Sequence, residues 1–281
     1  MVYLSAFAIL SILPVILTIT NSCMKSQEIY TVYSGIVDSD IIIENIIPAE
    51  KTIVKIIPDQ FSLEQYIKIL FQTSEYLHKF WNAIILVVPI VTLQIIIGAL
   101  AAYGFTIKRG KLYNILMYIY IVLMLMPYQV LLVPNYIVAE KFNLLNTRAS
   151  IILPGVFSTF SVFLITKTMR RIPAEILEAA KIDGANDIKI FILICMPLCK
   201  NIVYSLIIII FVDYWNMIEQ PLIMLSDVNK QPLSVYLSAI NYKELGTAFA
   251  LSVIFLIPPL LIFMYGAEYL EDGIATYGGV K

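Results

Sequence analysis

Long apolar stretches recur along this chain and are separated by shorter polar segments. A helix that crosses a membrane needs about 20 consecutive, largely apolar residues. Six stretches meet this requirement: 3–22, 81–107, 112–133, 149–168, 200–224 and 246–267. The pattern therefore predicts an all-α polytopic membrane protein with six transmembrane helices. Pro89, Pro127 and the pair Pro258–Pro259 predict kinks, which membrane helices tolerate when neighbouring groups satisfy the freed carbonyls.

Residues 25–80 separate the first two apolar stretches. The part 29–57 is rich in Ile, Val and Tyr, which predicts short strands. The part 62–80 predicts an amphipathic helix that begins at Ser62 as its cap. Its apolar residues recur at helical spacing: Leu63, Tyr66, Ile67, Leu70 and Phe71.

Composition supports the membrane class. Hydrophobic residues make up 60% of the 281 residues and charged residues only 14%, whereas soluble domains are about half apolar and a quarter charged. The formal net charge is −1. Without a basic stripe to neutralise phosphates, nucleic acid is excluded as a partner.

The distribution of Lys and Arg predicts the orientation. The loop 108–111 reads KRGK, and the segment 167–200 carries six Lys or Arg residues. With six crossings both lie on one side, which the positive-inside rule makes cytoplasmic together with both termini. We therefore divide the chain into a first transmembrane helix at 1–24, an extracytoplasmic loop at 25–80, a five-helix core at 81–267 that contains the loop 167–200, and a cytoplasmic tail at 268–281.

A polar segment within the loop 167–200 predicts a short helix followed by a sharp turn. Pro173 suits the first turn of a helix, Glu175 suits its positive end, and Gly184 suits the left-handed C′ position. The helix has about ten residues and is about 15 Å long, too short to cross a membrane. Asn186 or Asp187 can cap a second helix that runs towards the membrane.

The residues alone leave two interpretations of this short helix open. Ile176, Leu177, Ala179 and Ala180 cluster on one broad side, with charged residues on the other. Such a helix can lie at the membrane interface. Its small residues can equally bring another protein close to the backbone.

The sequence of residues 178–197 resembles the EAA signature of ABC-importer permeases, EAA-x3-G-x9-I-x-LP. The matching residues are Glu178, Ala179, Ala180, Gly184, Ile194 and Pro197. Met196 stands where Leu is usual, a swap that conserves volume. Asp183, Gly184 and Ala185 look like the IDGA of carbohydrate-type permeases.

The resemblance to the maltose-permease-type family covers roughly residues 60–281. It includes "YGFTIKRGKLYN", "MPYQVLLVPNYIVAEKFNLLNTRASIILP", "RRIPAEILEAAKIDGA", "DYWNMIEQPLIML" and the tail "EYLEDGIATYGGVK". The chain departs from the family at 25–58, at Ala83 after Asn82, where Ser is common, and in lacking a basic N-terminal tail.

The resemblance implies the type I ABC-importer permease fold and a bacterial cytoplasmic (plasma) membrane location. In such importers two permease chains, often different ones, form the pore within membrane lipid. Two ATPase subunits dock underneath, and an extracytoplasmic sugar-binding protein delivers the cargo. This chain would then be a non-catalytic subunit that binds no cofactor, because the partner ATPase binds ATP and Mg²⁺.

The resemblance also assigns roles in coupling to the ATPase. Glu178 would pair with a basic residue of the ATPase, Ala179 and Ala180 would form the close-packing surface, and Gly184 would make the turn. Asp183 could either cap the helix or form a pair, and Ala185 completes the motif.

Polar residues interrupt the fifth apolar stretch. A charge at mid-bilayer costs about 2.5–3.5 kcal/mol on insertion scales, so it faces protein or water. The predicted substrate path consists of Asp213, Tyr214, Trp215 and Asn216. Aromatic rings stack on sugar faces, while carboxylates and amides bond hydroxyls. The alternative is a helix-packing hydrogen bond, or the end of the span near the interface.

The sequence gives little support for metal binding, nucleotide binding or catalysis by this chain. Cys23, Cys195 and Cys199 are expected to be structural, and no metal site is expected. No GxxxxGK[ST], HExxH, CxxC or GxSxG motif occurs. Two alternatives to a sugar importer remain: a permease for a non-sugar solute, or a membrane anchor or assembly protein that transports nothing.

Overall fold

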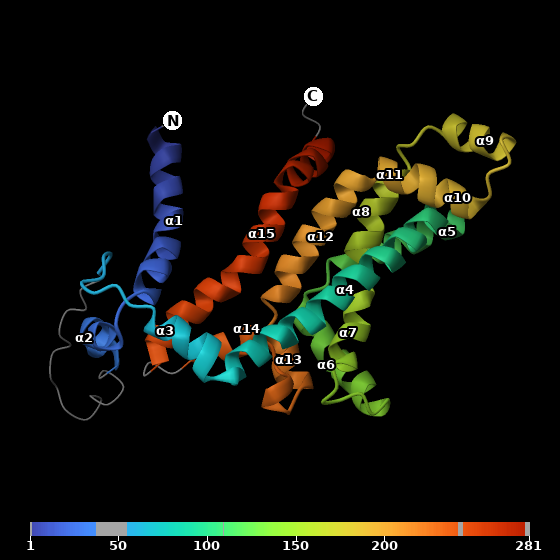
Figure 1. The fold of residues 1–281 in the computed structure, drawn as a ribbon. Helices are drawn as coiled ribbons and strands as arrows, with labels where there is room; N and C mark the ends of the chain where they lie inside the picture. The colour runs from blue at the N-terminus through green and yellow to red at the C-terminus, as the bar shows by residue number, and fades with distance from the viewer. Residues whose placement is uncertain (1, 38–54, 109, 241–243, 279–281) are drawn as a thin grey trace. The chain divides into compact units, whose positions relative to one another are not determined.

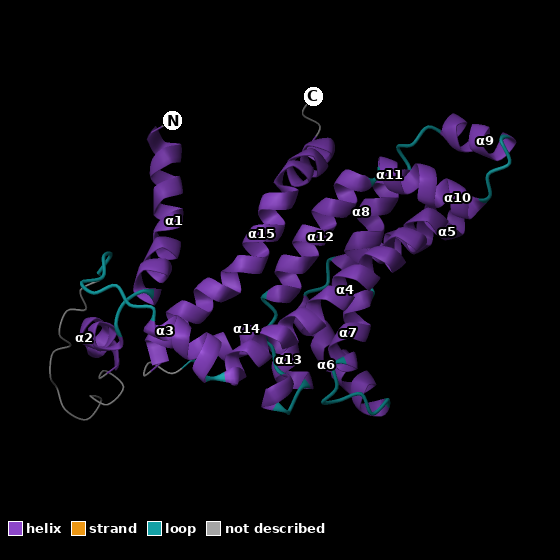
Figure 2. Ribbon diagram, in the orientation of Figure 1, coloured by secondary structure: helices purple, strands orange, loops and turns teal. Residues whose placement is uncertain are grey.

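The computed structural model describes residues 2–37, 55–108, 110–240 and 244–278, and this part of the chain is almost entirely helical (Figure 1). Within the described residues there is no strand, and the one extended pairing is an isolated bridge between Met24 and Phe61 (Figure 2). The predicted all-α class is confirmed.

The helices follow one another with short connections. In chain order they are α1 (Val2–Ser22), α2 (Ser26–Val37), α3 (Glu64–Ile67), the π-helical turn η3 (Lys68–Gln72), α4 (Ser74–Ile107), α5 (Lys111–Met124), α6 (Tyr128–Lys141), α7 (Ala149–Val156), α8 (Thr159–Met169), α9 (Ala174–Ile182), α10 (Asp187–Ile190), the π-helical turn η4 (Phe191–Cys195), α11 (Met196–Leu198), α12 (Lys200–Trp215), α13 (Glu219–Met224), the 3₁₀ turn η5 (Val228–Lys230), α14 (Leu233–Ser238) and α15 (Leu245–Gly278).

Long apolar helices account for the predicted spans. In the described part of the chain, four helical segments are long and apolar enough to cross a membrane: Tyr3–Ser22, Ser74–Ile107, Ala149–Met169 and Leu245–Leu270. Two bent pairs also qualify, Lys111–Met124 with Tyr128–Lys141 and Asp187–Leu198 with Lys200–Trp215. The count reaches the predicted six when each bent pair is one crossing.

The third and fifth spans are not the straight helices that the sequence predicts. The predicted stretch 112–133 breaks before Pro127, where the chain bends by 102°, because proline lacks an N–H and disfavours helix at the preceding residue. The predicted stretch 200–224 is not one helix: Glu219–Met224 form the separate helix α13, and α12 ends at Trp215. At its end the Asn216 side chain donates a 2.8 Å hydrogen bond to the Val212 carbonyl.

Residues 26–37 form a helix, so the prediction of short strands over 29–57 is wrong in this part. Ile29 and Tyr33 are four residues apart and face the same way in α2. Ile29 is buried, and the Tyr33 ring lies 5.7 Å from that of Phe249. The helix thereby packs both side chains on one face. The rest of the predicted strand region, 38–54, lies outside the described residues.

The predicted amphipathic helix 62–80 is divided at Thr73, whose backbone is extended. Ser62 does not cap α3; its hydroxyl accepts only from the Glu64 N–H. Before Thr73 the buried residues are Gln65 and Ile69, whereas most of the predicted apolar face is exposed: Leu63, Ile67, Leu70 and Phe71. The inward face is set instead by Gln65, which donates to the Ser26 hydroxyl and accepts from that of Thr247.

The chain divides into two compact units. The first comprises Met1–Ala83 and Gln231–Pro258, and the second Ile84–Lys230 and Pro259–Lys281. The core of the first is formed by Ile69, Tyr76, Leu233, Ala250 and Leu251. One core cluster of the second is formed by Leu86, Ile90, Ala139, Ile151, Met224 and Leu225.

Small and polar residues bring α4 and α8 together in the second unit. The buried Gln94 amide donates a 2.9 Å hydrogen bond to the Ser161 hydroxyl. One turn along, a Cβ at Gly98 would lie 3.4 Å from the Ser161 Cβ. Small residues and interhelical hydrogen bonds of this kind drive helix association in lipid, where burial of apolar surface contributes little.

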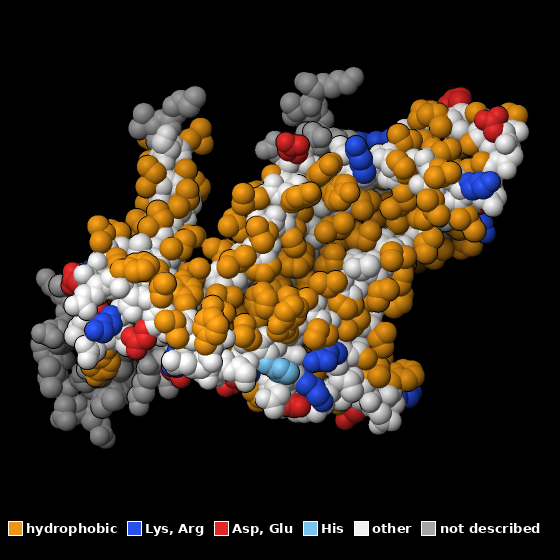
Figure 3. All heavy atoms as spheres, viewed as in Figure 1, with side chains coloured by type: hydrophobic (Ala, Val, Ile, Leu, Met, Phe, Trp, Pro, Cys, Tyr) orange, Lys and Arg blue, Asp and Glu red, His pale blue; other side chains and the backbone are white. Residues whose placement is uncertain are grey.

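Apolar side chains cover the outside of the spans as well as the inside. Figure 3 shows them along α4 and α12, with charged side chains gathered towards the helix ends. None of the apolar window of α1 is buried within the chain. A helix that is apolar all round and unburied is suited to contact lipid or another membrane helix.

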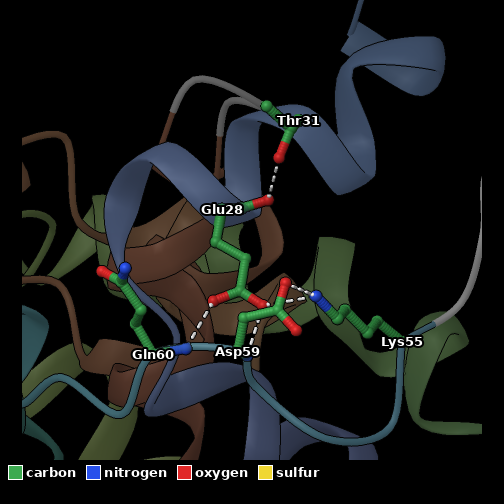
Figure 4. Close-up of polar contacts among 5 residues, drawn as sticks. All are labelled: Glu28, Thr31, Lys55, Asp59 and Gln60. Carbon is green, nitrogen blue, oxygen red and sulfur yellow. Dashed lines mark hydrogen bonds and ion pairs between the residues drawn. The ribbon is translucent and has the colours of Figure 1, made fainter.

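In the first unit a carboxylate fixes the segment that precedes α3 (Figure 4). The Glu28 carboxylate accepts hydrogen bonds from the Asp59 N–H at 2.8 Å and the Gln60 N–H at 3.3 Å. It also pairs with Lys55 at 2.9 Å, and Lys55 in turn contacts Asp59. The Asp59 N–H is the main reason that the pKa of Glu28 lies below its ordinary value, and Lys55 lowers it further.

We expect Glu28→Gln to loosen residues 55–60. In the wild type the ionised Glu28 carboxylate accepts the hydrogen bonds from the Asp59 and Gln60 amides. Protection of these amides from exchange therefore persists at neutral pH and is lost as the pH falls through the lowered pKa of Glu28. The variant should show about three- to tenfold faster hydrogen exchange at these amides at neutral pH, after correction for intrinsic rates. Glu64→Gln is the control, and equal exchange in the two variants would contradict this role for Glu28.

Candidate functional site

The helix α9, Ala174–Ile182, lies at the end of the second unit on two loops and stands apart from the other helices (Figure 1). It begins directly after Pro173, whose extended ψ places it before the helix rather than in its first turn. None of its residues is buried. This nine-residue helix is the one that the sequence predicts between Pro173 and Gly184, and it is too short to cross a membrane.

Gly184 ends α9 in the left-handed conformation that the sequence predicts. Its φ is +80°, and the Gly184 N–H donates to the Lys181 carbonyl at 3.1 Å. The Ala185 N–H donates to the Ala180 carbonyl at 2.9 Å. These two bonds are a Schellman motif. A Cβ at Gly184 would meet nothing within 4 Å, so the need for glycine comes from the backbone angle and not from crowding.

After this turn the chain re-enters the bundle. Of the two caps that the sequence allows, the structure uses Asn186, whose side chain accepts from the Lys189 N–H at 2.9 Å. The segment Asp187–Leu198 then runs through the π-helical turn η4 and meets α12 at an angle of 74°. Ile194 and Pro197 of the signature thus lie directly before this bend.

Both flanks of the α9 loop are attached to the end of α4. On one side, the Arg170 guanidinium donates to the Phe105 carbonyl at 3.0 Å. On the other, the Tyr103 hydroxyl donates to the Asp187 carbonyl at 2.9 Å, and its ring lies 5.1 Å from that of Phe191. Neither attachment was predicted from the sequence. They hold both ends of the loop while leaving α9 itself uncovered.

The α9 loop presents apolar side chains to its surroundings. Ile182 is 87% exposed, and Ile176 and Ile188 are exposed too. Glu178 and Ala179 are also exposed. Exposed apolar residues next to a carboxylate are typical of a surface that contacts another molecule or a membrane. Both the membrane interface and a partner protein fit this pattern.

The predicted substrate-path residues gather around a second feature, a hollow of about 650 Å³. Its walls come from the end of α12, the start of α6, and the segment that leads into α13. The lining residues are Tyr128, Gln129, Val212, Asp213, Tyr214, Asn216, Met217, Ile218, Glu219 and Gln220. Carboxylates, amides and phenol rings thus meet in one place.

Three of the four predicted path residues line this hollow, and Trp215 does not. The Trp215 side chain is 1% exposed and stacks on the Phe211 ring with centroids 5.2 Å apart. It is part of the core, because the α12 turn that places Tyr214 and Asn216 at the hollow points Trp215 inward. We therefore remove Trp215 from the proposed path.

The structure adds residues that the sequence analysis missed. Tyr128 and Gln129 reach the hollow because α6 begins right after the 102° bend at Pro127. The signal available in the sequence was the polar "YQ" after a proline within an apolar stretch. Tyr214 is held in place by tight packing, since a Cβ at Gly155 would lie 3.2 Å from its ring. Its hydroxyl also donates to the Gly155 carbonyl at 3.4 Å.

Cys195 and Cys199 are buried free thiols on the segment that leads into α12. Among the residues that the structure describes, no group of three or more His, Cys, Asp or Glu residues is placed to hold a metal ion.

Comparison with known proteins identifies the family. Residues 94–276 match the family described as "Binding-protein-dependent transport system inner membrane component". The chain belongs to this family. It is therefore a multi-pass membrane protein of a transport system that works with a binding protein and an ATPase. The resemblance to ABC-importer permeases in the sequence is confirmed.

Individual relatives agree with the family. The permease is 28% identical to the lactose transport system permease protein LacG of Rhizobium radiobacter, over 72% of this chain and 74% of that one. It is 31% identical to the melibiose/raffinose/stachyose import permease protein MelC of Bacillus subtilis, over 73% and 76%. It shares its fold with a chain of a bacterial ABC transporter involved in the import of the acidic polysaccharide alginate, with a TM-score of 0.77, 19% identity and 95% and 94% coverage.

We expect Gly184→Pro to abolish ATP-driven uptake while the permease still reaches the membrane. Proline fixes φ near −65° and has no N–H, so it can adopt neither the +80° of Gly184 nor the bond to Lys181. Gly184→Ala should weaken uptake less, because a left-handed alanine costs about 1–2 kcal/mol. Uptake of labelled solute and immunoblots of membranes measure the two quantities.

Gly104→Ala provides the control for these substitutions. Gly104 lies within α4 and a Cβ there meets nothing within 4 Å, so uptake should remain near that of the wild type. Normal uptake by Gly184→Pro at normal membrane levels would contradict the role of this turn.

Proposed function

We propose that this chain is the permease subunit of an ATP-driven, binding-protein-dependent importer for a sugar or oligosaccharide. The observation that carries the proposal is the polar hollow at the end of α12. It combines carboxylates, amides and tyrosine rings at the point where one span of a transport permease bends by 102° and α12 ends. These groups suit the hydroxyls and the flat faces of a sugar. Relatives named for lactose and for melibiose, raffinose and stachyose support the same cargo class.

The permease lies in the bacterial plasma membrane with α9 and both termini in the cytoplasm. Two observations support this orientation: the density of Lys and Arg in 108–111 and 167–200, and the location of both segments at the same end of α4. α12 starts at that end and finishes at the hollow. The hollow then lies towards the extracytoplasmic side, from which a binding protein delivers its cargo.

α9 is the coupling helix in this proposal. Two ATPase subunits dock on the cytoplasmic side of this permease and a second, different permease subunit. They bind ATP and Mg²⁺, and this chain contributes no catalytic group. Ala179, Ala180 and the exposed isoleucines allow close packing, and Glu178 offers a carboxylate for a basic residue of the ATPase. Asp183, Gly184 and Ala185 shape the turn behind that surface.

A small number of connected helices transmits movement of α9 to the hollow. Movement of α9 is passed through the segment Asp187–Leu198 to the 74° bend and then along α12. With 16 residues, α12 is about 24 Å long and ends where Asp213, Tyr214 and Asn216 line the hollow. A tilt of α12 thus changes the shape of the sugar site directly.

We expect Glu178→Lys to stop uptake and to release the ATPase. The substitution places a cation opposite the expected basic residue of the partner, and like charges there repel. Purification of the tagged permease from its native membrane should recover the ATPase with the wild type and not with the variant. Glu140→Lys, the same change at an exposed residue of α6, should leave recovery intact. If the ATPase never accompanies the wild type, the anchor or assembly interpretation replaces the importer.

We expect Asp213→Asn and Asn216→Ala to weaken sugar uptake without disturbing the ATPase complex. Loss of a hydrogen bond to a charged group costs about 1.5–3 kcal/mol, so Asp213→Asn should raise the KM of uptake about tenfold or more. The neutral Asn216 amide contributes about 0.5–1.5 kcal/mol, so Asn216→Ala should raise it about two- to tenfold. Asp227→Asn is the control, because Asp227 lies outside the hollow and pairs with Lys230. A panel of labelled oligosaccharides, phosphate and polyamines identifies the cargo. Uptake of a non-sugar solute alone would contradict the assignment of a carbohydrate cargo but not the assignment as an importer.

A further inference from the structure

A groove of about 420 Å³ lies between α5 and α8 and plays no part in the function proposed above. One wall consists of Asn114, Met117, Tyr118 and Ile121 of α5, and the other of Phe163, Thr166, Lys167 and Arg170 of α8. Each set has the spacing i, i+3, i+4 and i+7, which is one face of a helix. Since seven residues of helix rise by about 10 Å, the groove follows both helices for about that length.

The two ends of the groove differ in polarity. Asn114 lies in the first turn of α5, and Arg170 is the residue that ends α8. Arg170 reaches Phe105, near the end of α4, and the Phe105 ring lies 6.5 Å from that of Tyr113 in the first turn of α5. The end of α8 thus meets the start of α5. Asn114 and Arg170 mark one end and Ile121 and Phe163 the other, with Lys167 between them.

The two cationic groups are held in this groove. The Lys167 ammonium lies 5.9 Å from the centre of the Phe163 ring, close enough for a cation–π contact. The Arg170 guanidinium uses one N–H on the Phe105 carbonyl. A guanidinium carries five N–H groups, so donors remain for an anion. Both side chains are exposed, and a ligand can reach them from outside.

We propose that this groove binds one anionic phospholipid. The phosphate contacts Lys167 and Arg170, and an acyl chain lies along Met117, Ile121 and Phe163. Arginine and lysine pairs bind phosphate strongly, and basic pockets between membrane helices at the cytoplasmic surface suit acidic headgroups. The apolar half of the groove favours a lipid over a soluble phosphate. The leaflet rests on the orientation proposed above, in which this end of α8 faces the cytoplasm.

The position of the groove gives the lipid a regulatory role. Arg170 lies four residues before Ala174, the first residue of α9, and it already anchors that loop to α4. A headgroup bound to Arg170 adds a contact at the base of the coupling helix and restricts its motion. The content of anionic lipid in the membrane then tunes the coupling between ATPase and permease.

The test is native mass spectrometry of the purified full-length chain with dioleoylphosphatidylglycerol or dioleoylphosphatidylcholine. The wild type should retain one phosphatidylglycerol in preference to phosphatidylcholine. Lys167→Gln combined with Arg170→Gln should lower that retention about tenfold. Lys189→Gln combined with Lys200→Gln removes the same charge from two other exposed residues and should retain the lipid. Equal loss in both double variants, or no preference in the wild type, overturns the proposal.

Two further arms separate a lipid from a soluble anion and from a folding defect. Ile121→Trp fills the apolar end without changing charge, so it should also reduce phosphatidylglycerol retention. Displacement of the lipid by an equal concentration of glycerol 3-phosphate or inorganic phosphate would contradict a lipid occupant. Arg170→Lys keeps the charge and should bind better than Arg170→Gln if the variants are folded. The assay measures lipid binding only, so a negative result leaves the importer assignment standing.

Discussion

A backbone inside a bilayer must satisfy its own hydrogen bonds, and the rest of this structure depends on that constraint. A break in a spanning helix leaves N–H and carbonyl groups that lipid cannot satisfy. Such a break is stable only where protein or water surrounds it. The permease breaks two of its spans, with bends of 102° and 74°. The first bend, together with the end of α12, forms the polar hollow, and the second directs the chain towards α9. The irregular points are therefore the ones to which we assign a function.

The two functional regions are joined by a small number of elements in the second unit. α4 holds both flanks of the α9 loop through Phe105 and Tyr103, so the loop cannot swing free of the bundle. α12 begins at the 74° bend and reaches the hollow at Asp213. Between them, α8 is tied to α4 by Gln94 and Ser161. In the proposed coupling, a displacement of α9 is carried by packed helices and hydrogen bonds, which are stiff compared with loops.

The sequence predicted those features that depend on local chemistry. Gly184 was predicted at a left-handed position because only glycine adopts it at little cost, and Asn186 is a favoured cap. The number of spans followed from hydropathy alone. Features set by distant contacts were missed. Gln65 turns α3 inward through bonds to Ser26 and Thr247, against the apolar periodicity.

The same distinction explains the fate of the predicted substrate path. Asp213 and Asn216 are polar side chains in an apolar stretch. Each must therefore face a water-filled cavity or a hydrogen-bonding partner inside the protein. Trp215 carries no such requirement, because its large ring is accommodated equally well by a sugar or by a neighbouring ring such as Phe211. Local sequence cannot decide whether the Trp215 ring faces a sugar or packs in the core. Tyr128 was missed because its place beside Asp213 depends on the bend at Pro127.

Exposed apolar residues have different meanings in different parts of the permease. Along α1 they cover the helix on all sides without charged neighbours, which suits lipid. Around α9 they alternate with acidic and basic residues in a short loop that begins and ends at the same helix end. An interfacial helix could share that pattern, but α9 has only nine residues and carries Glu175 and Glu178, which the negative cytoplasmic surface of a membrane repels. A partner protein with basic residues fits the charge of α9 better than the lipid surface does.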